Sequence, residues 1–209
     1  MRIIRVAKKD EKNVIIYFDN EEKLFLTYAI FLKNGLKKND EISESRFSLL
    51  IEENQKYHLK QKAFQLLGRR HHSSFELKVK LKQKGYNENI IVEIINDLKT
   101  NGYLNDYEFA LLFSDENIKN KFWGKKKVEA ELFKRGIDRN IISQVIDEKF
   151  PSNGEINNAV ELGKKKLKSL LTRKIEKEKV RTKLYSFLIS KGYDYEICKR
   201  VIEILMPEQ

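Results

Sequence analysis

The sequence predicts a mainly α-helical protein of three tandem three-helix repeats, with a small α/β appendage at its N-terminus. A glycine-centred pattern recurs three times, and the first 50 residues depart from it with β-rich segments. Only 9 Gly and 2 Pro occur among 209 residues, which suits long helices better than a many-turned β fold. Each repeat is too small to bury its faces alone, so we expect the repeats to stack on one another.

The repeat is centred on Gly85, Gly136 and Gly192. Apolar residues eight and four positions before each glycine share one helix face, and a basic residue directly before it favours the negative end of the helix. Glycine can adopt the left-handed conformation that closes a helix, and the Asn or Asp two positions later can cap the next one. Apolar pairs further on form a buried stripe. Each copy therefore predicts a helix, a tight turn and a second helix.

The glycines are 51 and 56 residues apart, which leaves room for one more helix in each repeat. Apolar residues at helical spacing place these first helices at about 55–67, 106–120 and 155–172.

The N-terminal appendage follows a different pattern. Residues 3–6 and 14–18 are rich in β-branched residues, and residues 9–13 link them as a hairpin. Residues 21–33 predict a helix that Gly35 ends. An isolated hairpin is only marginally stable, so we expect it to pack on another element. The predicted domains are 1–54 for the appendage and 55–104, 105–154 and 155–209 for the repeats.

The formal net charge of +11 lies entirely after residue 54, because residues 1–54 carry 10 basic and 10 acidic groups. Such a surface attracts phosphate backbones or acidic protein grooves, although a merely solvated helical surface has the same composition. The single cysteine, Cys198, occupies an apolar repeat position and predicts a core residue in a reducing compartment. The sequence shows no signal peptide and no membrane-spanning run, so we expect a cytoplasmic protein.

Catalytic and metal-binding patterns are weak. His58, His71 and His72 do not share a helix face with other ligands, and Gly163-Lys164 lacks the earlier glycine of a phosphate loop. We expect no catalytic residue, no metal and no cofactor. Two motifs predict structure only. Residues 73–76 predict a capping box and residues 102–106 predict a turn with a helix cap. Tyr103 in that turn is expected to pack between repeats, with an interface aromatic as the alternative.

Basic clusters remain as the functional candidates. In stacked repeats, equivalent faces align, so these clusters predict one strip that binds a partner or nucleic acid. Beside them a tryptophan could stack on a base or fill the core. The candidate residues are Arg69, Arg70, Trp123, Lys125, Lys126, Lys127, Lys164, Lys165, Lys166, Arg173 and Lys174.

Together these motifs resemble the RecX family. The similarity is strongest in the second repeat, through Gly102-Tyr103-Leu104-Asn105-Asp106, Gly124-Lys125 and Gly136-Ile137, and it spans about residues 55–205. The resemblance implies an elongated, curved, non-enzymatic molecule. It also implies binding along the groove of the RecA–DNA filament, which in most members limits filament extension or inhibits recombinase and coprotease activity in DNA repair and the SOS response. In some members it implies assistance or destabilisation of filaments instead. The appendage and the longer third repeat depart from the family pattern.

Three functions follow from these expectations. The first is a monomeric regulator of the RecA protein and its DNA filament, which charge reversal at Lys125, Lys126 and Lys127 should disable without unfolding the chain. The second is a repeat protein that binds single- or double-stranded DNA directly. The third is a helical scaffold for a peptide partner.

Overall fold

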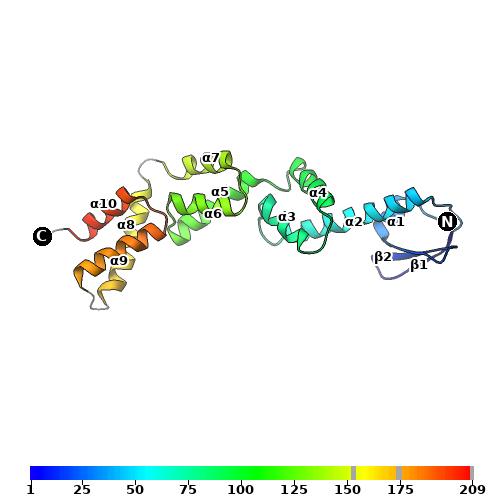
Figure 1. The fold of residues 1–209 in the computed structure, drawn as a ribbon, viewed down its shortest axis with the longest axis horizontal. Coiled ribbons are helices and arrows are strands. Elements are labelled where there is room, and N and C mark those ends of the chain that lie inside the picture. The colour runs from blue at the N-terminus through cyan, green and yellow to red at the C-terminus, as the bar shows by residue number, and fades with distance from the viewer. Residues whose placement is uncertain (152–153, 173–175, 208–209) are drawn as a thin grey trace. The chain divides into compact units, whose positions relative to one another are not determined.

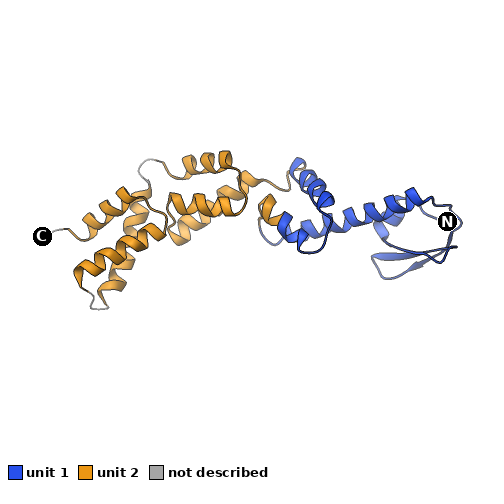
Figure 2. Ribbon diagram, viewed as in Figure 1, with its two compact units in different colours: residues 1–70, 78–100 blue, residues 71–77, 101–209 orange. Residues whose placement is uncertain are grey.

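The computed structural model describes residues 1–151, 154–172 and 176–207, and these contain three strands and ten helices (Figure 1). The predicted class, mainly α with three-helix repeats and a small α/β appendage, is confirmed. The chain divides into two compact units (Figure 2). Unit 1 holds Met1–Arg70 and Lys78–Thr100, and unit 2 holds His71–Leu77 and Asn101–Gln209. No described helix has the length and apolarity needed to cross a membrane.

Unit 1 begins with an antiparallel sheet of β1 (Ile3–Lys8), β2 (Asn13–Phe18) and β3 (Lys23–Thr27), in that order. The predicted hairpin is therefore present and is joined by a third strand. The sequence predicts a helix over residues 21–33, and for residues 23–27 that prediction is wrong. Leu24 and Leu26 alternate with exposed Phe25, so pairing with β2 buries both leucines on one face of the sheet. This pairing outweighs the local helical preference.

Helix α1 (Tyr28–Lys33) keeps the second half of the predicted helix. Thr27 caps its N-terminus by accepting a hydrogen bond from the Ile30 N–H, and Gly35 ends it at a φ of +59°, as predicted. Helix α2 (Glu44–Leu67) begins eleven residues before the predicted start, because Ser43 provides an N-cap to the Arg46 N–H. Its first turns contribute Phe47, Leu50 and Ile51 to a core with the inner face of the sheet.

The rest of α2 forms the first repeat with α3 (Ser74–Lys82) and α4 (Glu88–Thr100). Salt bridges tie α2 to α4, at 2.8 Å from Lys56 to Glu93 and at 2.5 Å from Lys60 to Asp97. Leu59, Ala63, Ile91 and Leu98 are fully buried on these helices, and the burial of Ala63 and Ile91 follows the repeat pattern. Helix α3 passes from unit 2 into unit 1 at residues 77–78.

Unit 2 contains the second and third repeats, each with a core of its own. The second comprises α5 (Asp106–Lys121), α6 (Lys125–Lys134) and α7 (Arg139–Lys149). The third comprises α8 (Gly154–Leu171), α9 (Lys177–Ser190) and α10 (Tyr195–Leu205). Cys198 is fully buried in the third core, as predicted, and burial raises the pKa of its thiol to about 11.

The turn glycines behave as the repeat predicts, with φ of +82° at Gly85, +69° at Gly136 and +92° at Gly192. The caps after them differ. Asn87 and Asp138 accept hydrogen bonds from the N–H groups two residues later, at 2.9 and 2.8 Å.

Asp194 makes no such cap and instead forms an ion pair with Lys126 of the second repeat. The turn at Gly102 and the Asn105 cap are confirmed, since the Asn105 side chain accepts from the Tyr107 and Glu108 N–H groups. Tyr103 is 60% exposed, so the expectation that it packs between repeats is wrong.

Candidate functional site

The repeats within unit 2 meet through a joint with the same design at each step. At each joint, the glycine turn of one repeat packs against the N-terminus of the middle helix of the preceding repeat. A carboxylate at the start of the next repeat's first helix accepts a hydrogen bond from the backbone N–H of the first residue of the middle helix. Helix N-termini leave such groups unsatisfied, so a carboxylate there stabilises both the helix and the contact.

The first joint connects residues 71–77 to the second repeat. The Ser74 N–H donates to Asp106 Oδ1 at 2.7 Å, and the Ser73 hydroxyl donates to the Arg135 carbonyl at 2.6 Å. Ser73 also accepts from the Glu76 N–H at 3.1 Å, as the predicted capping box requires. The Phe75 ring fills the space beside Gly136 that a larger residue would occupy.

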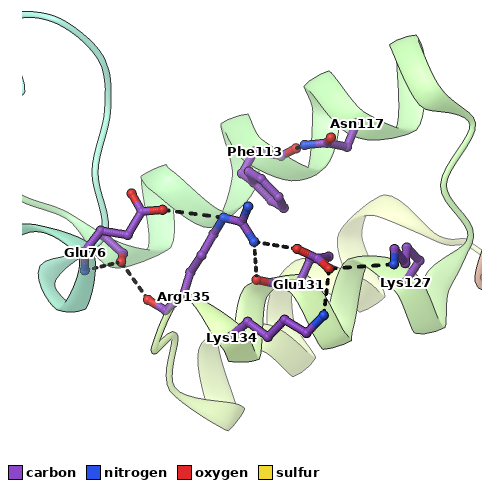
Figure 3. Close-up of polar contacts among 8 residues, drawn as sticks. Glu76, Phe113, Asn117, Lys127, Glu131, Lys134 and Arg135 are labelled. Atoms are coloured by element: carbon purple, nitrogen blue, oxygen red, sulfur yellow. Dashed lines mark hydrogen bonds and ion pairs between the residues drawn. The ribbon is translucent and has the colours of Figure 1, made fainter. Parts of the chain in front are cut away.

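Arg135 adds ion pairs to this joint, with Glu76 and with Glu131 (Figure 3). Its guanidinium donates to the Glu131 carboxylate at 2.8 Å and to the Glu131 carbonyl at 2.7 Å, and its Nε lies 3.6 Å from Glu76. The guanidinium carbon also lies 4.2 Å from the centre of the Phe113 ring. Hydrogen bonds from Arg135, and then from Lys134, hold the pKa of Glu131 at about 2.

The low pKa of Glu131 predicts a pH dependence. Its folded value of about 2 lies below the ordinary 4.5, so the ionised carboxylate contributes stability above pH 4.5 that is lost as pH falls toward 2. We expect Glu131→Gln to remove this contribution, so that the melting temperature falls less steeply with acid than that of the parent chain. Melting curves followed by Trp123 fluorescence across this pH range measure the difference. If the melting temperatures of the variant and the parent fell equally with acid, the low pKa of Glu131 would be contradicted.

The second joint connects Phe122–Lys127 to the third repeat. The Gly124 N–H donates to the Lys191 carbonyl at 2.8 Å, and the Lys126 N–H donates to the Gly192 carbonyl at 3.1 Å. The Lys125 N–H donates to Glu155 Oε1 at 2.8 Å, in the role that Asp106 plays at the first joint. Partial burial raises the pKa of Glu155.

Two further contacts close the second joint. The buried Tyr193 hydroxyl donates to the Phe122 carbonyl at 2.9 Å. A Cβ on Gly124 would lie 2.7 Å from the Gly192 carbonyl, which is too close for any residue other than glycine without a shift of the backbone.

The three consecutive lysines of the second repeat point to different places, because successive helical residues do not share a face. Lys125 lines an open cavity of about 550 Å³ beside Glu155 and Asp194. Lys126 is ion-paired with Asp194, which raises the pKa of Lys126. Lys127 lies 3.7 Å from Glu131 and 5.8 Å from the centre of the Trp123 ring.

The lysines of α8 reach the same joint. The ammonium of Lys165 lies 4.5 Å from the centre of the Phe122 ring, and that of Lys166 lies 4.9 Å from the Phe187 ring. Lys164 instead pairs with Glu161 at 2.9 Å. Thus Lys165 brings the basic cluster of the third repeat against a ring of the second repeat, although the basic clusters of the two repeats lie about 40 residues apart in sequence.

Two lysines at this joint were absent from the sequence candidates. Lys121 lies 4.9 Å from the Trp123 ring and Lys191 lies 5.5 Å from the Phe187 ring. Lys191 was interpreted only as a helix-ending residue, and Lys121 precedes the tryptophan by two positions. Each lies over a ring of its own repeat, two positions from Trp123 and four positions from Phe187 in the sequence. We call the following residues the joint surface: Lys121, Phe122, Trp123, Lys127, Lys165, Lys166, Phe187 and Lys191.

Trp123 is half-buried, and the expectation that it fills the core is met in part. One edge packs on the core of the second repeat, with its ring centre 6.0 Å from that of Phe113. The remaining surface lies under the ammonium groups of Lys121 and Lys127. An amphipathic ring in this position can anchor the fold and still present a face to a partner.

Two of the other candidates belong to unit 1. Arg69 and Arg70 are exposed in unit 1, just after α2. Arg173 and Lys174 lie outside the described residues. Within the described ranges, no three His, Cys, Asp or Glu side chains gather closely enough to hold a metal ion.

Comparison with known proteins identifies the repeats. Residues 60–98, 105–146 and 154–202 match family models described as the first, second and third three-helix domains of RecX. A regulatory protein RecX from Clostridioides difficile is 30% identical over 203 residues, which is 97% of this chain and 94% of that protein. One from Clostridium botulinum is 27% identical over 200 residues, which is 96% of this chain and 93% of its own length.

Solved structures show the same fold. A crystal structure of regulatory protein RecX has a TM-score of 0.76 at 17% identity, covering 97% of this chain and 98% of its own. The structure of RecX from Lactobacillus salivarius has a TM-score of 0.63 at 23% identity, covering 72% of this chain and 96% of its own. With three consecutive family domains and 30% identity across nearly its full length, the chain belongs to the RecX family of regulatory proteins.

Proposed function

We propose that this chain binds the RecA–DNA filament through the joint surface and inhibits RecA recombinase and coprotease activity. Membership of a family of regulatory proteins supports the class of function. The observation that carries the proposal is the charge of the joint surface. Within the described part of the chain, Lys121, Lys165, Lys166 and Lys191 form no ion pair with a carboxylate.

Cations placed over aromatic rings suit an anionic partner. A ring holds an exposed ammonium group by about 0.5–1 kcal/mol, which is less than a hydrogen bond to a charged group contributes. A phosphate or carboxylate can therefore recruit these lysines at little cost. The rings beneath them add apolar contact area.

The test is the ATP hydrolysis of the cognate RecA on single-stranded DNA. Increasing amounts of the purified chain should lower the hydrolysis rate, because filament that is capped or blocked cannot extend. A rate that stays constant at every stoichiometry would rule out the proposal. Lys165→Glu/Lys166→Glu protein provides the comparison for the surface itself.

A second candidate is direct binding of nucleic acid by the helical repeats, favoured by the same uncompensated lysines. It requires affinity for DNA in the absence of RecA. The logarithm of the binding constant should then fall with the logarithm of salt concentration, by roughly 0.7 to 0.9 for each phosphate contacted. Inhibition of RecA by a chain whose affinity for DNA is insensitive to salt would favour the first candidate alone.

A further inference from the structure

The N-terminal sheet has one covered face and one open face. Alternate β2 residues Val14, Ile16 and Phe18 are buried against the core that α1 and α2 complete. Ile15 and Tyr17 point to the opposite side, because side chains alternate along a strand, and both are only half-buried.

This open face carries two aromatic rings and three cations. Cross-strand pairing places Arg5, Tyr17 and Lys23 in one row. The Arg5 guanidinium carbon lies 5.3 Å from the centre of the Tyr17 ring, and the Lys23 ammonium lies 5.5 Å from it. In the next row Phe25 is 51% exposed, with the Lys9 ammonium 4.9 Å from its ring. We call Arg5, Lys9, Tyr17, Lys23 and Phe25 the sheet surface.

Charge is segregated within this part of the chain, although residues 1–54 are neutral as a whole. The three strands contain basic residues and no acidic residue. Asp10 and Asp19, in the connecting turns, accept hydrogen bonds from the backbone N–H groups of Lys12 and Arg2, both at 2.8 Å. Among the residues that the structure describes, no carboxylate forms an ion pair with the three cations of the sheet surface.

We propose that the sheet surface binds single-stranded DNA, with bases stacked on Phe25 and Tyr17 and with phosphates contacting Arg5, Lys9 and Lys23. Aromatic side chains on an exposed sheet can stack on unpaired bases, whose faces a duplex would hide. Three cations that form no ion pair among the described residues complement the charge of the DNA backbone. The choice of DNA rests on the proposed RecA function, and this surface is separate in residues from the joint surface.

The test measures binding of a fluorescein-labelled oligothymidine to the full chain by fluorescence anisotropy, without RecA. We expect Phe25→Ala to weaken binding about tenfold, the effect of losing one stacked base. We expect Arg5→Gln/Lys23→Gln to reduce the steepness of the salt dependence by about 1.4, for two lost phosphate contacts on a single strand. The matched control is Lys37→Gln/Lys38→Gln, which removes the same charge from exposed positions of unit 1 and should change neither quantity.

All substituted side chains in the two test variants are exposed, so their melting curves by circular dichroism should match the parent. A second measurement locates the DNA, since ultraviolet crosslinking should attach thymine to peptides of residues 3–27. Unchanged affinity and salt dependence in both variants, or crosslinks confined to the helical repeats, would overturn the proposal. Tighter binding of oligouridine than of oligothymidine would overturn the choice of DNA.

The remaining alternative is that a protein occupies the sheet surface. In that case the variants would keep their affinity for oligothymidine and lose their effect on RecA, which would also overturn the proposal. Because the binding assay contains no RecA, its failure leaves the proposed inhibition of RecA unaffected, and the ATP hydrolysis assay decides that function separately.

Discussion

Replacing Gly192 with alanine should lower the free energy of unfolding of unit 2 by about 3 kcal/mol. Its φ of +92° lies in a region that costs an L-residue roughly 1–2 kcal/mol. Its added Cβ would also overlap the backbone of Lys127, whose Cα would be 2.8 Å away. Backbone cannot swing aside as a side chain can, so relieving the overlap costs about 1–3 kcal/mol more and opens the second joint.

Gly102→Ala is the matched control for this prediction. Gly102 lies in the same unit at a φ of +74°, but an added Cβ there meets no atom within 4 Å. Gly102→Ala should therefore cost only the strain of the left-handed backbone, about 1–2 kcal/mol. Denaturant unfolding followed by tryptophan fluorescence compares the two, because the single tryptophan, Trp123, reports on unit 2. Equal losses in the two variants would show that the contact with Lys127 contributes nothing.

Reversing Lys165 and Lys166 to glutamate should weaken binding to the RecA–DNA filament about a hundredfold. A hydrogen bond to a charged group contributes about 1.5–3 kcal/mol, and each 1.4 kcal/mol is a factor of ten in affinity. Both lysines lie over aromatic rings of the joint surface and neither contributes an ion pair within the described chain. Their removal should therefore spare the fold. Filament binding is measured by co-sedimentation with RecA on single-stranded DNA.

The control for this reversal is Lys183→Glu/Lys199→Glu, an equal change of charge at exposed positions of the same repeat. It should bind the filament nearly as the parent chain does. Equal losses in both double variants would mean that only the net charge of the chain matters. Normal binding by the Lys165 and Lys166 variant would remove the joint surface from the proposed site.

The structure also changes how the reversal predicted at Lys125, Lys126 and Lys127 should be interpreted. Glutamate at position 126 would face Asp194 and would replace an ion pair between repeats with a repulsion. Lys127 is packed beside Gly192 and lies near Glu131. Lost binding by that triple variant would therefore combine a weakened joint with a lost contact. The Lys165→Glu/Lys166→Glu variant tests the lost contact alone, because across the described ranges neither lysine forms an ion pair between the repeats.

Local sequence determined most of the helical architecture. Glycines at left-handed turns, the caps at Asn105 and Asp138, and apolar spacing are properties of short segments, and these predicted the repeats and the buried position of Cys198. The same local motifs carried the resemblance to the RecX family. They suffice because a helix and its caps satisfy their hydrogen bonds within a few residues.

Tertiary structure decided the rest, because its outcome depends on residues far apart in the chain. Strand β3 forms because β2 offers a partner, against the local helical preference of residues 23–27. Asp194 leaves its own helix uncapped because Lys126 of another repeat is within reach. The contact of Lys165 with the Phe122 ring likewise follows from the stacking of two repeats. The sequence could identify the basic clusters, but only packing determined which charges are compensated and which remain available to a partner.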